Sequence, residues 1–285
     1  LLTERLVHRS DQEVVATRYA LGRVTTGDII SPEDLPAFPR STMDGYSVRA
    51  ADTFGATEGL PAYLEIVGEV QMGQMPCVEI GLGRAAKAFT GGMLAKGANA
   101  VVMVENTQAL DDHTIEVMRP VAPGENVLQI GEDVSAGGNV LSKGHVLRAQ
   151  DIGGLMALGI TSVEVAAKPK VSIVSTGSEL VPPGQSPALG EVRDVNTYTI
   201  SGLVEGAGGS PIPIALVEDN YEVQCRVAKE GLARGDVLVF SAGSSVSARD
   251  MTADVIGSLG KPGILVHGLA HKPGKPAVVA MIEGK

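Results

Sequence analysis

The sequence predicts an elongated, multi-domain chain of the α/β plus β class, with a β-rich domain and an α/β domain built on a parallel sheet. Two observations support this prediction. Short apolar alternations separated by Gly, Pro and Asp occupy residues 37–135, which is typical of strands joined by turns. From Val171 onward, strand-like and helix-like segments alternate, which indicates parallel strands joined by right-handed crossovers.

A connecting and dimerisation domain of mixed helix and strand is predicted from residues 1–36 together with 136–168. The stretch Asp11–Gly22 is expected to form a short helix, because Asp suits the start of a helix and Gly the position just after its end. The second part is expected to contain a helix at Gln150–Leu158 ended by Gly159, a strand at Thr161–Val165 and a boundary at Lys168-Pro169-Lys170.

The β-rich domain is assigned to residues 37–135. Its strands are expected at Ala62–Val70, Ala100–Val104 and Thr114–Met118, where apolar residues alternate or form a short dense run. Gly, Pro and an Asp-Asp pair separate these runs, so a small barrel or sandwich is predicted.

The α/β domain is assigned to residues 169–285, and its strands and helices are expected to alternate. Asn196 is expected to cap the first helix. The expected strands are Val171–Ser175, Ile212–Val217, Val237–Phe240 and Ile264–Gly268. The expected helices are Asn196–Gly206, Tyr221–Ala233 and one that follows Asp250 and ends near Gly260.

Composition excludes several classes of function. The formal net charge is −10, so nucleic acid is not an expected partner. No apolar run approaches the length of a membrane span. The two cysteines, Cys77 and Cys225, lie in no CxxC or Cys/His cluster, so free thiols in a reducing cytoplasm are expected rather than a zinc site or a disulfide framework.

Acidic residues follow three of the predicted parallel strands. Ligands of open parallel sheets bind beyond the carboxyl ends of the strands, so Glu179, Asp219 and Asp250 are expected at one sheet edge. Asp219 and Asp250 suit Mg²⁺, which takes one or two carboxylates and bridges substrate phosphates. Each carboxylate taken singly is equally consistent with a solvated loop or a helix cap.

Two further loops suit an anionic ligand. Small residues fill nearly every position of the segment from Ser241 to Ser247, which lets backbone N–H groups approach a phosphate or a flat heterocycle. The same residues are common in ordinary turns. Lys272-Pro-Gly-Lys275 places two ammonium groups on a restricted turn, either as an anion clamp or as an exposed basic turn.

Five motifs occur in an order and spacing that resemble the molybdopterin molybdenumtransferase family, to which the C-terminal domain of gephyrin also belongs. The motifs are Thr42-Met-Asp-Gly-Tyr46, Thr90-Gly91 with Gly97–Glu105, Gly131-Glu-Asp133, Ser175-Thr-Gly with Glu179-Leu180, and Lys272-Pro-Gly-Lys-Pro276. The resemblance covers nearly the whole chain. It implies that the α/β domain binds molybdopterin.

The resemblance also implies an activity and a set of site residues. The activity is insertion of molybdate into adenylated molybdopterin with release of AMP, by a cytoplasmic, Mg²⁺-dependent homodimer. The implied catalytic residues are Asp44, Asp133, Glu179, Lys272 and Lys275. The implied substrate-binding or cofactor-binding residues are Thr90, Ser175, Thr176, Gly177, Ser241, Gly243 and Ser245, and the implied metal ligands are Asp219 and Asp250.

The chain departs from the family pattern at two places. Ala242, Ser244 and Ser247 replace two glycines and a valine of the family's glycine loop, and Met251 replaces its tyrosine. The family normally continues beyond the equivalent of Lys285 with a C-terminal β domain, which implies a truncated chain. A molybdopterin-binding scaffold without catalysis and an enzyme like molybdopterin adenylyltransferase remain alternatives, and molybdate is not distinguished from tungstate.

Overall fold

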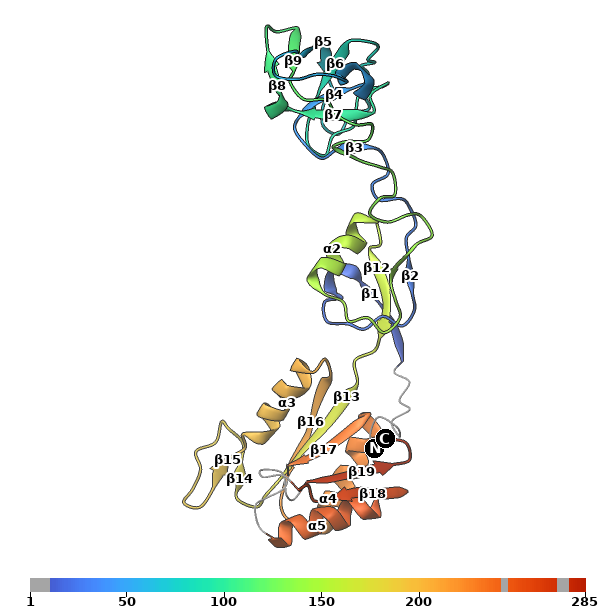
Figure 1. Ribbon diagram of the computed structural model, residues 1–285. Coiled ribbons are helices and arrows are strands. Elements are labelled where there is room, and N and C mark those ends of the chain that lie inside the picture. Colours follow the sequence, from blue (N-terminus) through green and yellow to red (C-terminus); the bar gives the residue numbers. More distant parts are fainter. Residues whose placement is uncertain (1–10, 242–245, 271–276) are drawn as a thin grey trace. The chain divides into compact units, whose positions relative to one another are not determined.

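The computed structural model describes residues 11–241, 246–270 and 277–285, and for residues 246–250 it describes the backbone alone. The chain divides into two compact units (Figure 1). The β unit comprises Gly27–His145 and Gln150–Thr161. The α/β unit comprises Leu1–Thr26, Val146–Ala149 and Ser162–Lys285. No helix of the described residues has the length and apolar character needed to cross a membrane.

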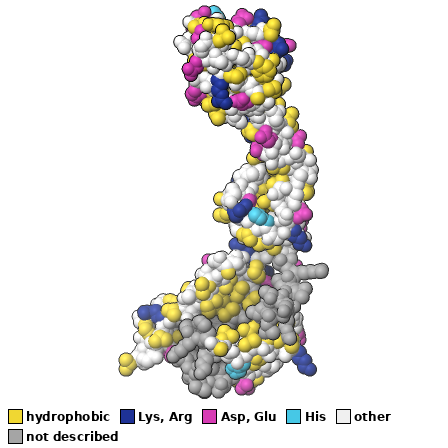
Figure 2. Space-filling model, in the orientation of Figure 1, with side chains coloured by type: hydrophobic (Ala, Val, Ile, Leu, Met, Phe, Trp, Pro, Cys, Tyr) yellow, Lys and Arg dark blue, Asp and Glu magenta, His cyan; other side chains and the backbone are white. Residues whose placement is uncertain are grey.

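A curled six-stranded sheet forms most of the β unit, which confirms the predicted β-rich domain. Across the sheet, the strands are β7 (Ala100–Met103), β4 (Gly45–Val48), β6 (Arg84–Ala88), β5 (Ala62–Glu69), β9 (Thr114–Val117) and β8 (Thr107–Ala109). The β5–β6 pair is parallel and the other pairs are antiparallel. One face buries an aliphatic cluster that includes Val48, Leu64, Val102 and Ile115. Figure 2 shows acidic and basic side chains interspersed on the drawn face of this unit.

Short ladders and one helix complete the β unit. The ladders pair β3 (Arg40–Ser41) with β10 (Val127–Leu128) and β2 (Ile29–Ile30) with β11 (Asn139–Leu141). Helix α2 (Ala149–Ala157) ends as predicted, because Gly159 takes a φ of +69° and the Ile160 N–H returns to the Leu155 carbonyl at 2.9 Å.

Three parallel strands form the centre of the α/β unit, in the order β16 (Ser210–Val217), β13 (Lys170–Thr176) and β17 (Val237–Ser241). Helices α3 (Asn196–Gly206), α4 (Tyr221–Arg234) and α5 (Val246–Ser258) follow β15, β16 and β17 in the chain. A short parallel pair, β14 (Leu180–Val181) and β15 (Val192–Arg193), lies between β13 and α3 in sequence. Strand β13 is central, so Ile173 and Val174 are fully buried. The predicted parallel α/β domain is confirmed for these strands.

The helix predicted at Asp11–Gly22 is wrong. Residues Gln12–Ala16 form strand β1, which pairs antiparallel with β12 (Ser162–Ala166), and Thr17–Tyr19 form one 3₁₀ turn, η1. The β-branched pair in the middle of β1 favours a strand, and a partner about 150 residues later in the chain satisfies its backbone. Pairing with β12 therefore outweighs the helix-capping signal of Asp11 and Gly22.

The strand predicted at Ile264–Gly268 is present as β18, but its predicted parallel pairing is wrong. Strand β18 (Pro262–His267) pairs antiparallel with β19 (Val278–Ile282) in a separate two-stranded sheet. Helix α5 begins at Val246, ahead of the predicted start at Asp250. The alternation of strand and helix predicted one more parallel crossover. Instead β18 pairs with β19, the strand that follows it in the chain.

Candidate functional site

The loops that follow β13, β16 and β17 begin at one edge of the parallel sheet. Thr176 is in register with Val217, and Ser175 with Ser241. Hydrogen bonds join the loops beyond the last rungs: the Gly177 N–H donates to the Val217 carbonyl at 3.0 Å, and the Thr176 hydroxyl to the Ser241 carbonyl at 3.3 Å. The structure therefore brings the loops that carry Glu179 and Asp219 together.

Gly177 determines where the Glu179 carboxylate can lie. A Cβ atom at Gly177 would come within 2.7 Å of Glu179 Oε2, well inside van der Waals contact. The Leu180 N–H donates to the Gly177 carbonyl at 3.2 Å and closes the turn. Glu179 is exposed, so its carboxylate is open to solvent at the sheet edge while its position depends on the missing side chain of Gly177.

A buried network of hydroxyl and carboxylate groups lies next to this edge of the parallel sheet. Ser175 is fully buried, and its hydroxyl lies 2.7 Å from the Thr197 hydroxyl and 3.3 Å from Asp194 Oδ1. Asp194 Oδ1 also accepts the Thr197 N–H at 3.2 Å. This network couples the end of β13 to the start of α3. The sequence reasoning missed Asp194 and Thr197, although an Asp three residues before a helical N–H is an ordinary capping signal.

Asn196 does not cap α3 as predicted. It is the first residue of the helix, and its side-chain amide donates to the Ser241 hydroxyl at 2.7 Å. The cap position belongs to Val195, which offers no side-chain acceptor, so the carboxylate of Asp194 takes the capping role. Asn196 instead ties α3 to the end of β17, where the predicted small-residue loop begins.

Asp219 has the properties of a cation ligand. Its N–H donates to the Ser178 hydroxyl at 3.3 Å, which holds its backbone against the β13 loop. Its Oδ1 atom is buried and has no hydrogen-bond partner among the described residues. A buried carboxylate oxygen without a donor is costly unless a ligand completes it, so this donor fits Mg²⁺.

The protein does not by itself complete a metal cage in the part that the structure describes. No three His, Cys, Asp or Glu side chains gather around one point there. Mg²⁺ commonly binds one or two carboxylates and fills its other positions with water and substrate phosphates, so one described carboxylate is compatible with the ion. The backbone of Asp250 lies in α5, and its side chain is outside the description.

The predicted residues of the β unit gather around the loop that precedes β4. Asp44 Oδ1 accepts the Thr90 N–H at 2.8 Å and the Thr90 hydroxyl at 3.0 Å. These two donors, the backbone one first, lower the pKa of Asp44 below its ordinary value of 3.8. Asp44 is therefore ionised at neutral pH and held in one orientation. Gly45 makes this loop possible, because a Cβ there would lie 1.9 Å from the Val102 carbonyl oxygen.

Asp133 is connected to the same loop through Arg40 and Ser41. Arg40 Nη2 lies 3.8 Å from Asp133 Oδ2 in a partly exposed ion pair. The neighbouring Ser41 carbonyl accepts the Gly91 N–H at 2.7 Å, next to Thr90. The β unit thus carries the predicted residues Asp44, Thr90 and Asp133 on linked loops. Arg40 was missed because no motif distinguishes it from other surface arginines.

Four predicted residues lie outside the described parts of the chain: Gly243, Ser245, Lys272 and Lys275.

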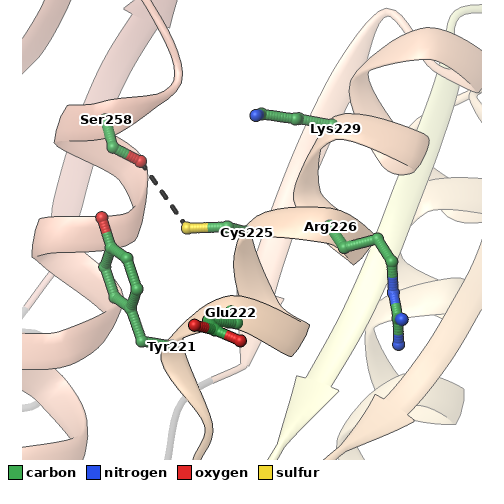
Figure 3. A pocket seen from close by; sticks show the side chains of 6 residues that line it. All are labelled: Tyr221, Glu222, Cys225, Arg226, Lys229 and Ser258. Carbon is green, nitrogen blue, oxygen red and sulfur yellow. Dashed lines mark hydrogen bonds between the residues drawn. The ribbon is translucent and has the colours of Figure 1, made fainter.

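Among the described residues of the α/β unit, two pockets are relevant to the site. One, of about 180 Å³, is lined by Asp194, Thr197, Tyr198 and Leu216, among other residues, and adjoins the buried hydroxyl network. The other, of about 570 Å³, lies between α4 and α5, where Tyr221, Cys225 and Ser258 face one another (Figure 3). The second pocket is lined by none of the predicted site residues, and the first is lined by two members of the network, Asp194 and Thr197.

Two family models match the chain. "MoeA N-terminal region (domain I and II)" matches residues 2–159, and "Probable molybdopterin binding domain" matches residues 172–285. The molybdopterin molybdenumtransferase of Nostoc sp. is 33% identical over 279 residues, which cover 98% of this chain and 64% of that protein. The molybdopterin molybdenumtransferase of Bacillus subtilis is 31% identical over 275 residues, with 95% and 64% covered.

The solved structures agree with the sequence comparison. A molybdopterin biosynthesis MoeA protein from Pyrococcus horikoshii OT3 matches with a TM-score of 0.82 at 36% identity, covering 98% of this chain and 69% of that one. The chain spans 64% of the length of each of the two transferases.

Proposed function

Because the chain belongs to the MoeA family of molybdopterin biosynthesis proteins, we propose that it acts as a molybdopterin molybdenumtransferase in molybdenum cofactor biosynthesis. The substrates are adenylated molybdopterin and molybdate, and the products are molybdenum cofactor and AMP. The named transferases among its relatives support this proposal, and so does the family predicted from the motifs, which is confirmed. The match to the MoeA N-terminal region over residues 2–159 favours it over an adenylyltransferase, which needs only the α/β domain.

The observation that carries the proposal is the sheet edge where the loops after β13 and β16 meet. Asp219 offers a buried oxygen there that has no hydrogen-bond partner among the described residues, and Glu179 offers an exposed carboxylate on the loop that is bridged to it. In the proposal, Asp219 holds Mg²⁺ together with Asp250. When bound, the ion supplies Lewis-acid activation of the phosphoanhydride.

The remaining residues bind and orient the substrates. Two Mo–S bonds form as two Mo–O bonds of molybdate break, and the displaced oxygens leave as water with the protons of the two thiols and further protons from solvent. Water attacks one phosphorus of the anhydride, the bridging P–O bond breaks, and AMP leaves while the pterin keeps its own phosphate. Asp44, Asp133 and Glu179 position the pterin and the metal, with Asp44 held ionised by Thr90. The net charge of −10 gives no general attraction for anions, so Lys272 and Lys275 are assigned to hold the molybdate or the phosphates.

The assembly is proposed to be a cytoplasmic homodimer. The two free cysteines, Cys77 exposed and Cys225 half-buried, support a reducing compartment. Sedimentation equilibrium tests the assembly: a mass twice that of one chain is expected, and a monomer at micromolar concentration contradicts it.

Release of AMP from adenylated molybdopterin tests the function. Wild type is expected to release AMP in a manner that depends on both molybdate and Mg²⁺, and Asp219→Asn to slow release by about 100-fold or more. Asp254→Asn makes the same charge change at an exposed position of α5 and is the matched control, expected to keep wild-type activity. Tight binding of the substrate without any AMP release would identify the chain as a scaffold instead.

A further inference from the structure

Gln224 is a polar residue on the buried face of a helix. The buried residues of α4 are Gln224, Val227, Ala228 and Gly231, whose spacing defines the face that packs against the sheet. Gln224 is fully buried at the head of this face. A buried amide lowers stability unless it is hydrogen-bonded, so a polar side chain at such a position needs a specific partner.

The partner is the backbone that carries Asp219. Gln224 Nε2 donates to the Glu218 carbonyl oxygen at 3.4 Å, and the same oxygen accepts the Asn220 N–H at 2.8 Å. The next group of that peptide, the Asp219 N–H, donates to the Ser178 hydroxyl at 3.3 Å. The peptide between Glu218 and Asp219 is therefore held at its carbonyl end by α4 and at its N–H end by the β13 loop.

The orientation of the amide follows from this contact. A carbonyl oxygen only accepts, so the nitrogen of the Gln224 amide faces Glu218 and its oxygen is left over. Gln224 Oε1 is buried and has no hydrogen-bond partner among the described residues. Among the described residues, the other buried side-chain acceptor without a hydrogen-bond partner is Asp219 Oδ1. Two unpartnered acceptors on one short stretch of chain call for a donor or a cation.

We propose that Gln224 is a positioning residue for Asp219. Its amide nitrogen fixes the peptide that carries Asp219, and its amide oxygen accepts a hydrogen bond from water that accompanies the cation at Asp219. This inference rests on the proposed role of Asp219 as a Mg²⁺ ligand. Mg²⁺ retains several waters in protein sites, and every such water is a donor. Residues that hydrogen-bond to a metal ligand typically affect metal affinity although they do not contact the ion themselves.

Binding of Mn²⁺ alone, measured by electron paramagnetic resonance on the whole chain, tests the proposal. Gln224→Met keeps the shape of the side chain and removes both polar atoms. We expect it to weaken Mn²⁺ binding by about 10- to 100-fold, as loss of an outer partner does at other metal sites. Asp219→Asn defines the binding that belongs to this site, and competition by Mg²⁺ shows that both ions share it.

Ser172→Ala is the matched control for stability. Ser172 is also fully buried, and its hydroxyl donates to the Gly231 carbonyl at 2.8 Å, at the opposite end of α4. Its loss removes a buried hydrogen bond of the same helix without contacting Glu218 or Asp219. We expect this variant to lower thermal stability while keeping wild-type Mn²⁺ affinity.

A second readout separates positioning from packing. Hydrogen exchange of the peptide that contains Asp219 is expected to quicken in Gln224→Met and to stay unchanged in Ser172→Ala. Wild-type Mn²⁺ affinity in Gln224→Met, or equal weakening in both variants, would overturn the proposal. Equal Mn²⁺ binding by wild type and Asp219→Asn would remove the metal site on which the proposal rests. AMP release is measured independently, so failure of the activity is distinguished from failure of this inference.

Discussion

Gly45 follows Asp44 and is the first residue of β4, and its replacement by alanine tests how the β unit holds its site. The added Cβ would lie 1.9 Å from the Val102 carbonyl oxygen and 2.9 Å from its carbon. Ordinary contact needs roughly 3.5 Å, so the strands must separate by more than an ångström. Both contacting atoms are backbone, which cannot turn away as a side chain can.

The consequence is local opening of the β4–β7 ladder, in which Gly45 is opposite Met103. Overpacking of this kind costs about 3 kcal/mol. Since each 1.4 kcal/mol is a factor of ten, the open population of this ladder should rise about 100-fold. Asp44 moves with β4, so its hydrogen bonds with Thr90 should weaken as well.

Hydrogen exchange followed by mass spectrometry measures this opening without the assumption that the two units unfold together. Peptides that cover β4 and β7 should exchange about 100-fold faster in Gly45→Ala. Gly59→Ala is the control, because nothing lies within 4 Å of its added Cβ and the residue is exposed. Unchanged exchange of β4 and β7 in Gly45→Ala would refute the close approach of these strands.

Three other outcomes follow from the site. In NMR, Asp44 should titrate below its ordinary pKa of 3.8, so its stabilising contacts are complete above that pH and are lost as the pH falls through the lowered pKa. Thr90→Val keeps the N–H and removes the hydroxyl, so it should bring the pKa of Asp44 part of the way back. An ordinary pKa of Asp44 in wild type would contradict these hydrogen bonds. Gly177→Ala should displace the Glu179 carboxylate and slow AMP release, while a rate equal to wild type would show that this carboxylate is not needed at its present place. Lys272→Ala should weaken molybdate or nucleotide binding by about 10- to 100-fold, more at low salt, and equal calorimetric affinities would identify an ordinary exposed turn.

Local sequence patterns predicted where many strands and helices lie. The alternation at residues 62–70 became β5, the dense run at 171–175 became the central β13, and the helix ended by Gly159 is present. The two misses share a physical cause, which is the partner that each segment takes. Strand β1 depends on β12 about 150 residues away, and β18 takes β19 as its antiparallel partner. The sequence of a strand does not identify the strand with which it pairs.

The candidate site divides in the same way. Parallel topology predicted that Glu179 and Asp219 lie at one sheet edge, and the structure adds that β13 and β16 are neighbours whose register places these loops together. The residues that hold those loops were not predictable, because Gln224 and Asp194 act through contacts that exist only in the folded chain. A polar residue inside an apolar helical stripe was the one available signal for Gln224.

The central claim is that the edge formed by the loops after β13 and β16 binds the pterin nucleotide. Hydrogen exchange of the whole chain with and without adenylated molybdopterin and Mg²⁺ tests it most directly. We expect slower exchange in peptides that cover residues 175–180 and 217–221, and loss of that protection in Asp219→Asn. Protection confined to other segments, or no protection at saturating ligand, would contradict it.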